Sequence, residues 1–167
     1  MFFFLGLLSC KFIKGDDDKI SMKRMDNFSQ ALRLDGYYYG GDVPQDSMRT
    51  VYFFFRNGIV MCPGTFSLRQ LERVDTFFAN TEFVKKSPKY MWGVYEIKER
   101  NIAFEKWYPS NASLQSFLRL GRILNDSTFV ITQSLRSDGR EENGENELYR
   151  YKAFRPKPDS TNAYIKE

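Results

Sequence analysis

Apolar and polar residues alternate along most of the chain, and a period of two is typical of β-strands. The clearest case is the segment from Met91 to Tyr108, which contains both tryptophans, Trp92 and Trp107. It predicts two strands joined by the polar turn 98–101, and a four-residue loop fits a β-hairpin. We expect this hairpin to lie at the centre of an antiparallel sheet.

Six further segments show strand patterns. Asn57-Gly58, between the second and the third of them, is a strong hairpin signal. Pro63-Gly64 is expected to end the third strand, and the charged stretch 137–146 is expected to form a long loop. The predicted strands outside the tryptophan hairpin are 31–39, 49–55, 59–62, 114–124, 128–134 and 148–154.

The period changes to that of a helix between the third strand and the tryptophan hairpin. Ser67 followed by Gln70 has the pattern of a capping box at the start of this segment. We therefore predict a helix from about residue 68 to residue 80, packed over a barrel opening or against the sheet. Its expected apolar face consists of Leu68, Leu71, Val74 and Phe78.

Eight strands in up-and-down order, with one helix between the third and fourth, favour a mainly β fold that closes into an antiparallel barrel, because closure removes exposed sheet edges. The strand order and aromatic content resemble the lipocalin-like and calycin barrels over residues 31–155. Gly36-Tyr37-Tyr38 stands where lipocalins carry Gly-x-Trp. The alternative is an open, curved antiparallel sheet that holds the helix against its concave face.

The first nine residues are uncharged and mostly apolar. They are too few to span a bilayer but suit the apolar region of a signal peptide. Leu7-Leu8-Ser9-Cys10 resembles the lipobox of bacterial lipoproteins, and this resemblance implies lipidation of Cys10 as the mature N-terminus. The alternative is a buried N-terminal strand. We expect a flexible tether over residues 10–30 and an irregular tail over residues 156–167.

Two further patterns resemble those of Bacteroidetes envelope proteins. Asp16-Asp17-Asp18 resembles their lipoprotein export signal, which implies attachment to the outer membrane and exposure on the cell surface; a solvated tether is the alternative. Three Asp-Ser tripeptides resemble their O-glycosylation motif, which implies modification of Ser47, Ser127 and Ser160. Asp and Ser also gather in turns for local hydrogen bonding.

Composition narrows the chemistry. The chain of 167 residues is 42% hydrophobic and contains no histidine, which excludes histidine-based catalysis, metal ligation and pH switching. Its net charge of +4 comes from scattered basic residues, so we expect no nucleic-acid partner. Glu96 and Glu105 either face each other across the hairpin or are solvent-facing charges, and Cys62 is expected to be a buried small hydrophobe. We expect no cofactor and no metal.

The aromatic side chains remain as candidate ligand contacts. If the barrel is hollow, Arg33, Arg119 or Arg150 is a candidate partner for an acidic head group. The resulting hypothesis is a non-enzymatic, lipid-anchored envelope protein that binds a small apolar ligand or a surface partner. The alternative is a structural or accessory subunit whose core is filled by rings. The candidate cavity residues are Tyr37, Tyr39, Phe53, Phe55, Tyr95, Phe104, Tyr149 and Tyr151.

Overall fold

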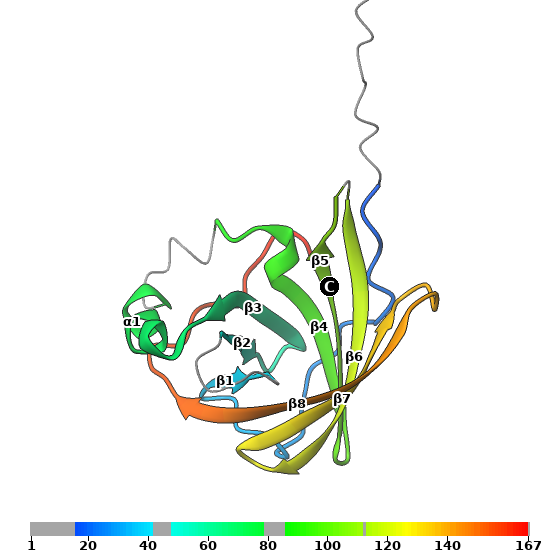
Figure 1. Cartoon of the computed structure of the whole chain (residues 1–167). Helices are drawn as coiled ribbons and strands as arrows, with labels where there is room; N and C mark the ends of the chain where they lie inside the picture. Colours follow the sequence, from blue (N-terminus) through cyan, green and yellow to red (C-terminus); the bar gives the residue numbers. More distant parts are fainter. Residues whose placement is uncertain (1–15, 42–47, 79–85, 112, 167) are drawn as a thin grey trace, which may run out of the picture.

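Each strand of the computed structural model pairs with its neighbours in sequence, and the last strand pairs with the first (Figure 1). Within the described residues, 16–41, 48–78, 86–111 and 113–166, eight antiparallel strands form a closed barrel with α1 between β3 and β4, which confirms the predicted fold class. The strands are β1 (Gly36–Gly40), β2 (Arg49–Phe54), β3 (Ile59–Phe66), β4 (Trp92–Lys98), β5 (Asn101–Pro109), β6 (Leu114–Asn125), β7 (Thr128–Arg136) and β8 (Glu142–Ala153). The helices are α1 (Leu68–Phe78) and the 3₁₀ turn η1 (Lys89–Met91).

Three strand boundaries differ from the predictions by more than two residues. Strand β3 continues through Pro63-Gly64 to Phe66, because its register with β2 shifts there and an irregularity tolerates a proline without an N–H. Strand β8 begins at Glu142, because the charged segment pairs with β7 as far as Leu135. Strand β1 begins at Gly36, and the residues before it do not join the sheet.

The tryptophan hairpin forms as predicted, but with a tighter turn. Lys98 pairs with Asn101, so only two residues form the loop, and Glu99 adopts a positive φ of 56° there. Strand β5 pairs with both β4 and β6, and both tryptophans are buried. The hairpin is therefore an integral part of the barrel wall, with β5 hydrogen-bonded to a strand on each side.

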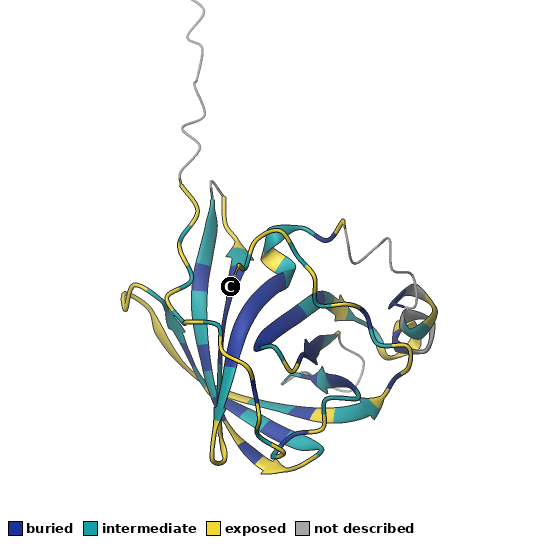
Figure 2. Cartoon of the chain, turned by 180° about the vertical axis from the view of Figure 1, so that it is seen from behind, coloured by how far each residue is buried: buried dark blue, intermediate teal, exposed yellow. Residues whose placement is uncertain are grey.

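Two apolar clusters lie on opposite faces of this wall. The inner cluster fills the barrel, and its rings meet across it: Tyr52 of β2 lies 4.9 Å from Phe104 of β5 and 5.3 Å from Tyr149 of β8, between ring centroids. The outer cluster lies between the sheet and α1. Its main members are Tyr37, Val51, Phe53, Met61, Leu71, Phe78, Trp92 and Phe154. Figure 2 shows the buried residues along the strands.

Helix α1 begins with the predicted capping box. The Ser67 N–H donates to Gln70 Oε1 at 2.8 Å, and the Gln70 N–H donates to Ser67 Oγ at 3.3 Å. Phe78 packs edge-on against Phe53, with ring centroids 5.0 Å apart, so the helix covers the outer face of the sheet. Leu68 is 46% exposed, contrary to the prediction, whereas Leu71 and Phe78 of the same predicted face are buried in the outer cluster. The side chain of Val74 lies outside the description.

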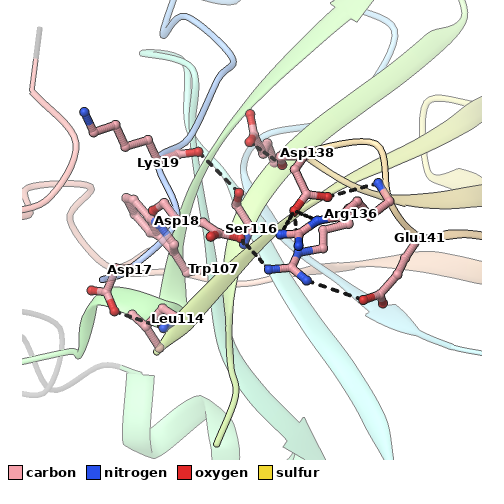
Figure 3. A network of polar contacts seen from close by, with 12 residues as sticks. Asp17, Asp18, Lys19, Trp107, Leu114, Ser116, Arg136, Asp138 and Glu141 are labelled. Carbon is pink, nitrogen blue, oxygen red and sulfur yellow. Dashed lines mark hydrogen bonds and ion pairs between the residues drawn. The ribbon is translucent and has the colours of Figure 1, made fainter. Parts of the chain in front are cut away.

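Residues 16–31, which we call the strap, lie against the barrel, so this part of the expected tether is docked. Figure 3 shows its first contacts, at Asp17, Asp18 and Lys19. The Asp18 N–H donates to the Leu114 carbonyl oxygen at 2.8 Å, and Trp107 Nε1 donates to the Asp18 carbonyl oxygen at 2.7 Å. Further along, the Asn27 N–H donates to the Arg56 carbonyl oxygen at 2.7 Å. The strap thus runs over the outside of the barrel from the beginning of β6 to the turn after β2.

Glu105 holds the middle of the strap. Its side chain is fully buried and accepts hydrogen bonds from the Ser21 N–H at 2.8 Å, the Met22 N–H at 2.7 Å, and the hydroxyls of Ser21 and Ser137. Both carboxylate oxygens are therefore satisfied by neutral donors. The expectation of a solvent-facing charge is wrong for Glu105, because the strap covers it.

Glu96 and Glu105 do not form a catalytic pair. The register places Glu96 opposite Ala103 and Glu105 opposite Val94. Glu96 is partly exposed and forms an ion pair with Lys98 at 3.0 Å.

One end of the barrel is closed by the chain that follows the strap. Leu32 belongs to the inner cluster, and the Arg33 N–H donates to the Asp126 carbonyl oxygen at 2.9 Å. The Asn57-Gly58 turn lies at the same end, where a Cβ on Gly58 would come within 2.1 Å of the Met25 carbonyl oxygen. The opposite end, where β5 ends and β6 begins, is here called the mouth.

Replacing Glu105 with Gln should loosen the strap. The substitution places an NH₂ group against N–H donors, and an unsatisfied buried polar group costs about 1–3 kcal/mol. We expect a loss of this size in the free energy of unfolding, measured by urea denaturation, together with faster proteolysis within residues 16–31. The matched control Glu96→Gln, on the same face of the hairpin, should change stability by less than about 0.5 kcal/mol. Equal effects of the two substitutions would contradict a clamping role for Glu105.

Candidate functional site

A pocket of about 210 Å³ opens inside the mouth of the barrel. It is formed by inward-facing residues from five strands, together with Tyr90 of η1. The pocket borders the inner cluster, because Tyr52 and Tyr149 belong to both. Toward the mouth, the apolar side chains of the barrel interior are thus followed by polar ones. The residues that define its chemistry are Tyr52, Tyr108, Tyr149, Lys106, Arg119 and Glu147.

The alternation of β5 produces this change of polarity. Ile102, Phe104, Lys106 and Tyr108 share one face, as the sequence predicts, and that face points into the barrel. Gly93 of β4 lies opposite Lys106, and a Cβ on Gly93 would come within 2.7 Å of the Lys106 Cβ. The missing side chain at position 93 therefore leaves room for the lysine inside the wall.

Lys106 is a buried cation without a carboxylate partner among the described residues. It is 5% exposed. Its Nζ donates to the Trp107 carbonyl oxygen at 2.9 Å and lies 3.5 Å from the centroid of the Tyr108 ring. These contacts use a carbonyl dipole and a π-face, so the positive charge itself is not neutralised.

Arg119 is the second buried cation, at 9% exposure. It forms an ion pair with Glu147, whose Oε2 also accepts a hydrogen bond from the Tyr149 hydroxyl at 2.7 Å. Arg119 Nε and the Tyr108 hydroxyl are both buried, and neither has a hydrogen-bond partner among the described residues. The pocket thus holds two cations, one carboxylate and two orphaned polar atoms.

Burial and neighbouring groups shift the pKa values of Arg119, Tyr149 and Cys62. Burial by itself lowers the pKa of Arg119, but the neighbouring Tyr108, Tyr52 and Glu147 raise it, and the net pKa lies above the ordinary value. Burial also raises the pKa of the Tyr149 phenol and of the Cys62 thiol. Near neutral pH the phenol and thiol therefore stay protonated, while the arginine stays charged. The arrangement can hold an anion, and neither the Tyr149 phenol nor the Cys62 thiol is activated as a nucleophile.

No protein-family model matches the sequence, and no curated protein or solved structure matches it either. The described segments contain no helix with the length and apolar character needed to cross a membrane. Nor do three potential metal-ligating side chains gather anywhere among the residues whose placement is described.

The eight predicted cavity residues divide between the two faces of the wall. Tyr95, Phe104 and Tyr149 belong to the inner cluster and Tyr151 packs against it, but only Tyr149 lines the pocket. The prediction is wrong for the other four, which belong to the outer cluster or pack against it. These four are Tyr37, Tyr39, Phe53 and Phe55. For Tyr37 and Tyr39 the reason is the alternation of β1: Tyr38 points into the barrel, so the residues before and after it point outward.

Of the three candidate arginines, only Arg119 reaches the pocket. Arg33 forms an exposed ion pair with Asp35 at 3.1 Å, and Arg150 is exposed opposite Tyr39. Sequence reasoning missed Lys106 as a site residue, although it shares the predicted face with Phe104. That shared face was the available signal.

The candidate modification sites lie away from the pocket. Cys10 and Ser47 fall outside the described residues. Ser127 lies in the turn between β6 and β7, and its hydroxyl donates to Asn125 Oδ1 at 2.9 Å. Ser160 lies in the tail, and its hydroxyl accepts a hydrogen bond from Asn57 Nδ2 at 3.0 Å. Both hydroxyls are partly buried and already have a partner.

Lys157 secures the tail at the closed end. Its Nζ donates to the carbonyl oxygens of Leu34, at 2.6 Å, and of Phe54, and it lies 4.4 Å from the centroid of the Phe55 ring. Burial lowers the pKa of Lys157 to about 8. The Lys157 amine therefore links the tail to the barrel by hydrogen bonds, in a buried environment that disfavours its positive charge.

The stability of the protein should depend on pH through Lys157. Its pKa is about 8 when folded and 10.5 in the free side chain, so between these values the unfolded chain binds more protons. The contribution of this group to stability should therefore rise from pH 8 to pH 10.5 and be lost as the pH falls through 8. We expect denaturation series across this range to show a rise that Lys157→Met lacks. Parallel profiles for the two proteins would refute the assignment.

Proposed function

We propose that the protein is a non-enzymatic binding protein of the cell envelope, which holds the acidic group of a small ligand in the mouth of its barrel. The observation that carries this proposal is the burial of Lys106 and Arg119 in one pocket with a single carboxylate, Glu147. Buried charge without a full set of partners costs free energy, so its retention needs a compensating role. A bound anion would supply the missing negative charge.

The size of the pocket limits the ligand. A volume of about 210 Å³ is below the range of about 300–1,000 Å³ typical of pockets for drug-sized molecules. The space beneath it is filled, with the Phe129 and Tyr149 rings stacked at 4.9 Å. The pocket therefore suits a head group or a very small acid, in place of the wholly apolar ligand that the aromatic content suggests.

The proposed location rests on the N-terminal residues. A lipid on Cys10, as the lipobox-like sequence implies, would tether the barrel to a membrane, and two or three acyl chains suffice for stable anchoring. The motif resemblances favour an outer-membrane lipoprotein of the Bacteroidetes type, with surface exposure as one alternative. Glycosylation at Ser47, Ser127 or Ser160 would belong to the same export route.

A structural role is the second candidate. The specific observation in its favour is the packed inner cluster, whose rings meet across the barrel. In that case the mouth would hold only water, and the barrel would serve as a rigid accessory subunit.

Native mass spectrometry of protein from the native host distinguishes the two functions. We expect a small acid to co-purify with the wild type and to be lost in Arg119→Gln, because this variant removes one of the two buried cations and leaves Glu147 without its ion-pair partner in the same pocket. The matched control Arg33→Gln, which removes an exposed arginine outside the pocket, should retain the acid. Circular dichroism checks that both variants fold. A ligand-free wild type would favour the structural role.

Membrane attachment should depend on Cys10. In the native host, Cys10→Ala should move the protein from the membrane to the soluble fraction and abolish labelling by a palmitate analogue, because the acylated thiol is gone. Cys62→Ala, which removes the other thiol, should leave attachment unchanged. Unchanged fractionation of Cys10→Ala would rule out the anchor.

Glycosylation of Ser47, Ser127 and Ser160 is tested by the intact mass of the wild-type protein from the native host. A mass equal to peptide plus lipid alone would rule out a glycan at all three serines.

A further inference from the structure

The strap begins at the mouth. Asp17 accepts a hydrogen bond from the Leu114 N–H at 2.9 Å (Figure 3). It also forms an ion pair with Lys89 at 2.8 Å. Leu114 is the first residue of β6, and Lys89 is followed by Tyr90, which lines the pocket. The described chain therefore starts beside the pocket and far from the closed end.

This attachment is held by several independent contacts. The carboxylate of Asp18 accepts a hydrogen bond from the Ser116 N–H at 3.1 Å and lies 3.5 Å from Arg136. Its backbone N–H and carbonyl oxygen bond Leu114 and Trp107, respectively. The strap cannot shift along the wall without breaking all of these contacts, so the point where it reaches the mouth is fixed.

We propose that the mouth faces the membrane, and that its ligand is an acidic lipid whose head group enters the pocket while its apolar chain stays in the bilayer. This inference rests on the proposed function, in that it takes the anchor to be at Cys10. Cys10 lies seven residues before Asp17. Such a linker spans at most about 25 Å, and about 15 Å when relaxed.

The length of the barrel decides which end approaches the bilayer. Strand β5 has nine residues, which corresponds to about 30 Å along the strand and about 20–25 Å along a tilted barrel axis. Turning the closed end toward the membrane would require an almost fully stretched linker, at a cost in chain entropy. With the mouth toward the membrane, the linker can stay relaxed.

The rim of the mouth suits contact with lipid. Met48 precedes β2, Leu68 follows β3 and Tyr90 precedes β4, so all three lie at this end. Their exposed fractions are 46%, 46% and 37%, respectively. The two buried cations lie behind this apolar rim, so an acidic amphiphile would meet apolar side chains at its tail and positive charge at its head.

The closed end also exposes apolar side chains, at Met25, Phe28 and Leu124. Exposure alone therefore does not distinguish the two ends. The attachment of the strap at Asp17 does.

Orientation is tested with the lipidated protein in phosphatidylcholine vesicles that contain a nickel-chelating lipid. Spin labels are placed by Ser110→Cys at the mouth or by Asn101→Cys at the closed end; both positions are exposed. Nickel should relax the label at position 110 several-fold more than the label at position 101. Equal relaxation, or stronger relaxation at position 101, overturns the orientation even if an acid co-purifies, so the proposed function would stand alone.

The lipid source is tested in the same vesicles with oleic acid carrying a ¹³C-labelled carboxyl group. A second carboxyl resonance should appear with the wild type and with Arg33→Gln, and be lost with Arg119→Gln. Free ¹³C-hexanoate without vesicles should give a weaker signal at the same concentration, because no bilayer concentrates it at the mouth. A hexanoate signal equal to that of oleate would overturn the membrane source while supporting the pocket. The absence of any new oleate resonance would overturn the assignment to a lipid acid.

Discussion

Closure of the sheet through the pairing of β1 with β8 is the constraint on which the rest of the structure depends. An eight-stranded barrel is just wide enough for side chains to fill its interior. Once closed, it assigns every strand residue to the inner or the outer face, and the large inward rings pack across the axis. The two buried cations inside the barrel, Lys106 and Arg119, lie at the mouth.

Two buried charged side chains, Glu105 and Arg119, differ in how completely their hydrogen-bonding groups are satisfied. Glu105, on the outer face, accepts hydrogen bonds at both oxygens, so its burial is compensated within the fold and it serves to hold the strap. Arg119, on the inner face, has Glu147 as its ion-pair partner, but its Nε has no hydrogen-bond partner among the described residues. Because an unsatisfied buried donor is costly, the difference separates a structural charge from one that favours a ligand.

The strap connects the fold with the proposed anchoring. The acidic run that resembles an export signal supplies structural contacts through Asp17 and Asp18, which join the strap to β6 and to Lys89. The two interpretations are compatible, since residues next to a lipid anchor can also determine how the barrel is presented. In the proposed arrangement, the same contacts that complete the outer wall would also orient the pocket toward its source of ligand.

Strand number, strand order, the capping box and the tryptophan hairpin were determined by the sequence itself, because each depends on periodicity or spacing among neighbouring residues. The face occupied by each tyrosine of Tyr37-Tyr38-Tyr39 was decided only by the tertiary structure, since three rings in succession carry no alternation and the pairing of Tyr38 with Tyr52 and Tyr151 sets the parity. The burial of Glu105 depends on Ser21, 84 residues earlier in the chain. Likewise, the extended form of residues 142–147 depends on pairing with β7. Local patterns specify elements, whereas the environment of a charge is set by partners that only the closed barrel brings together.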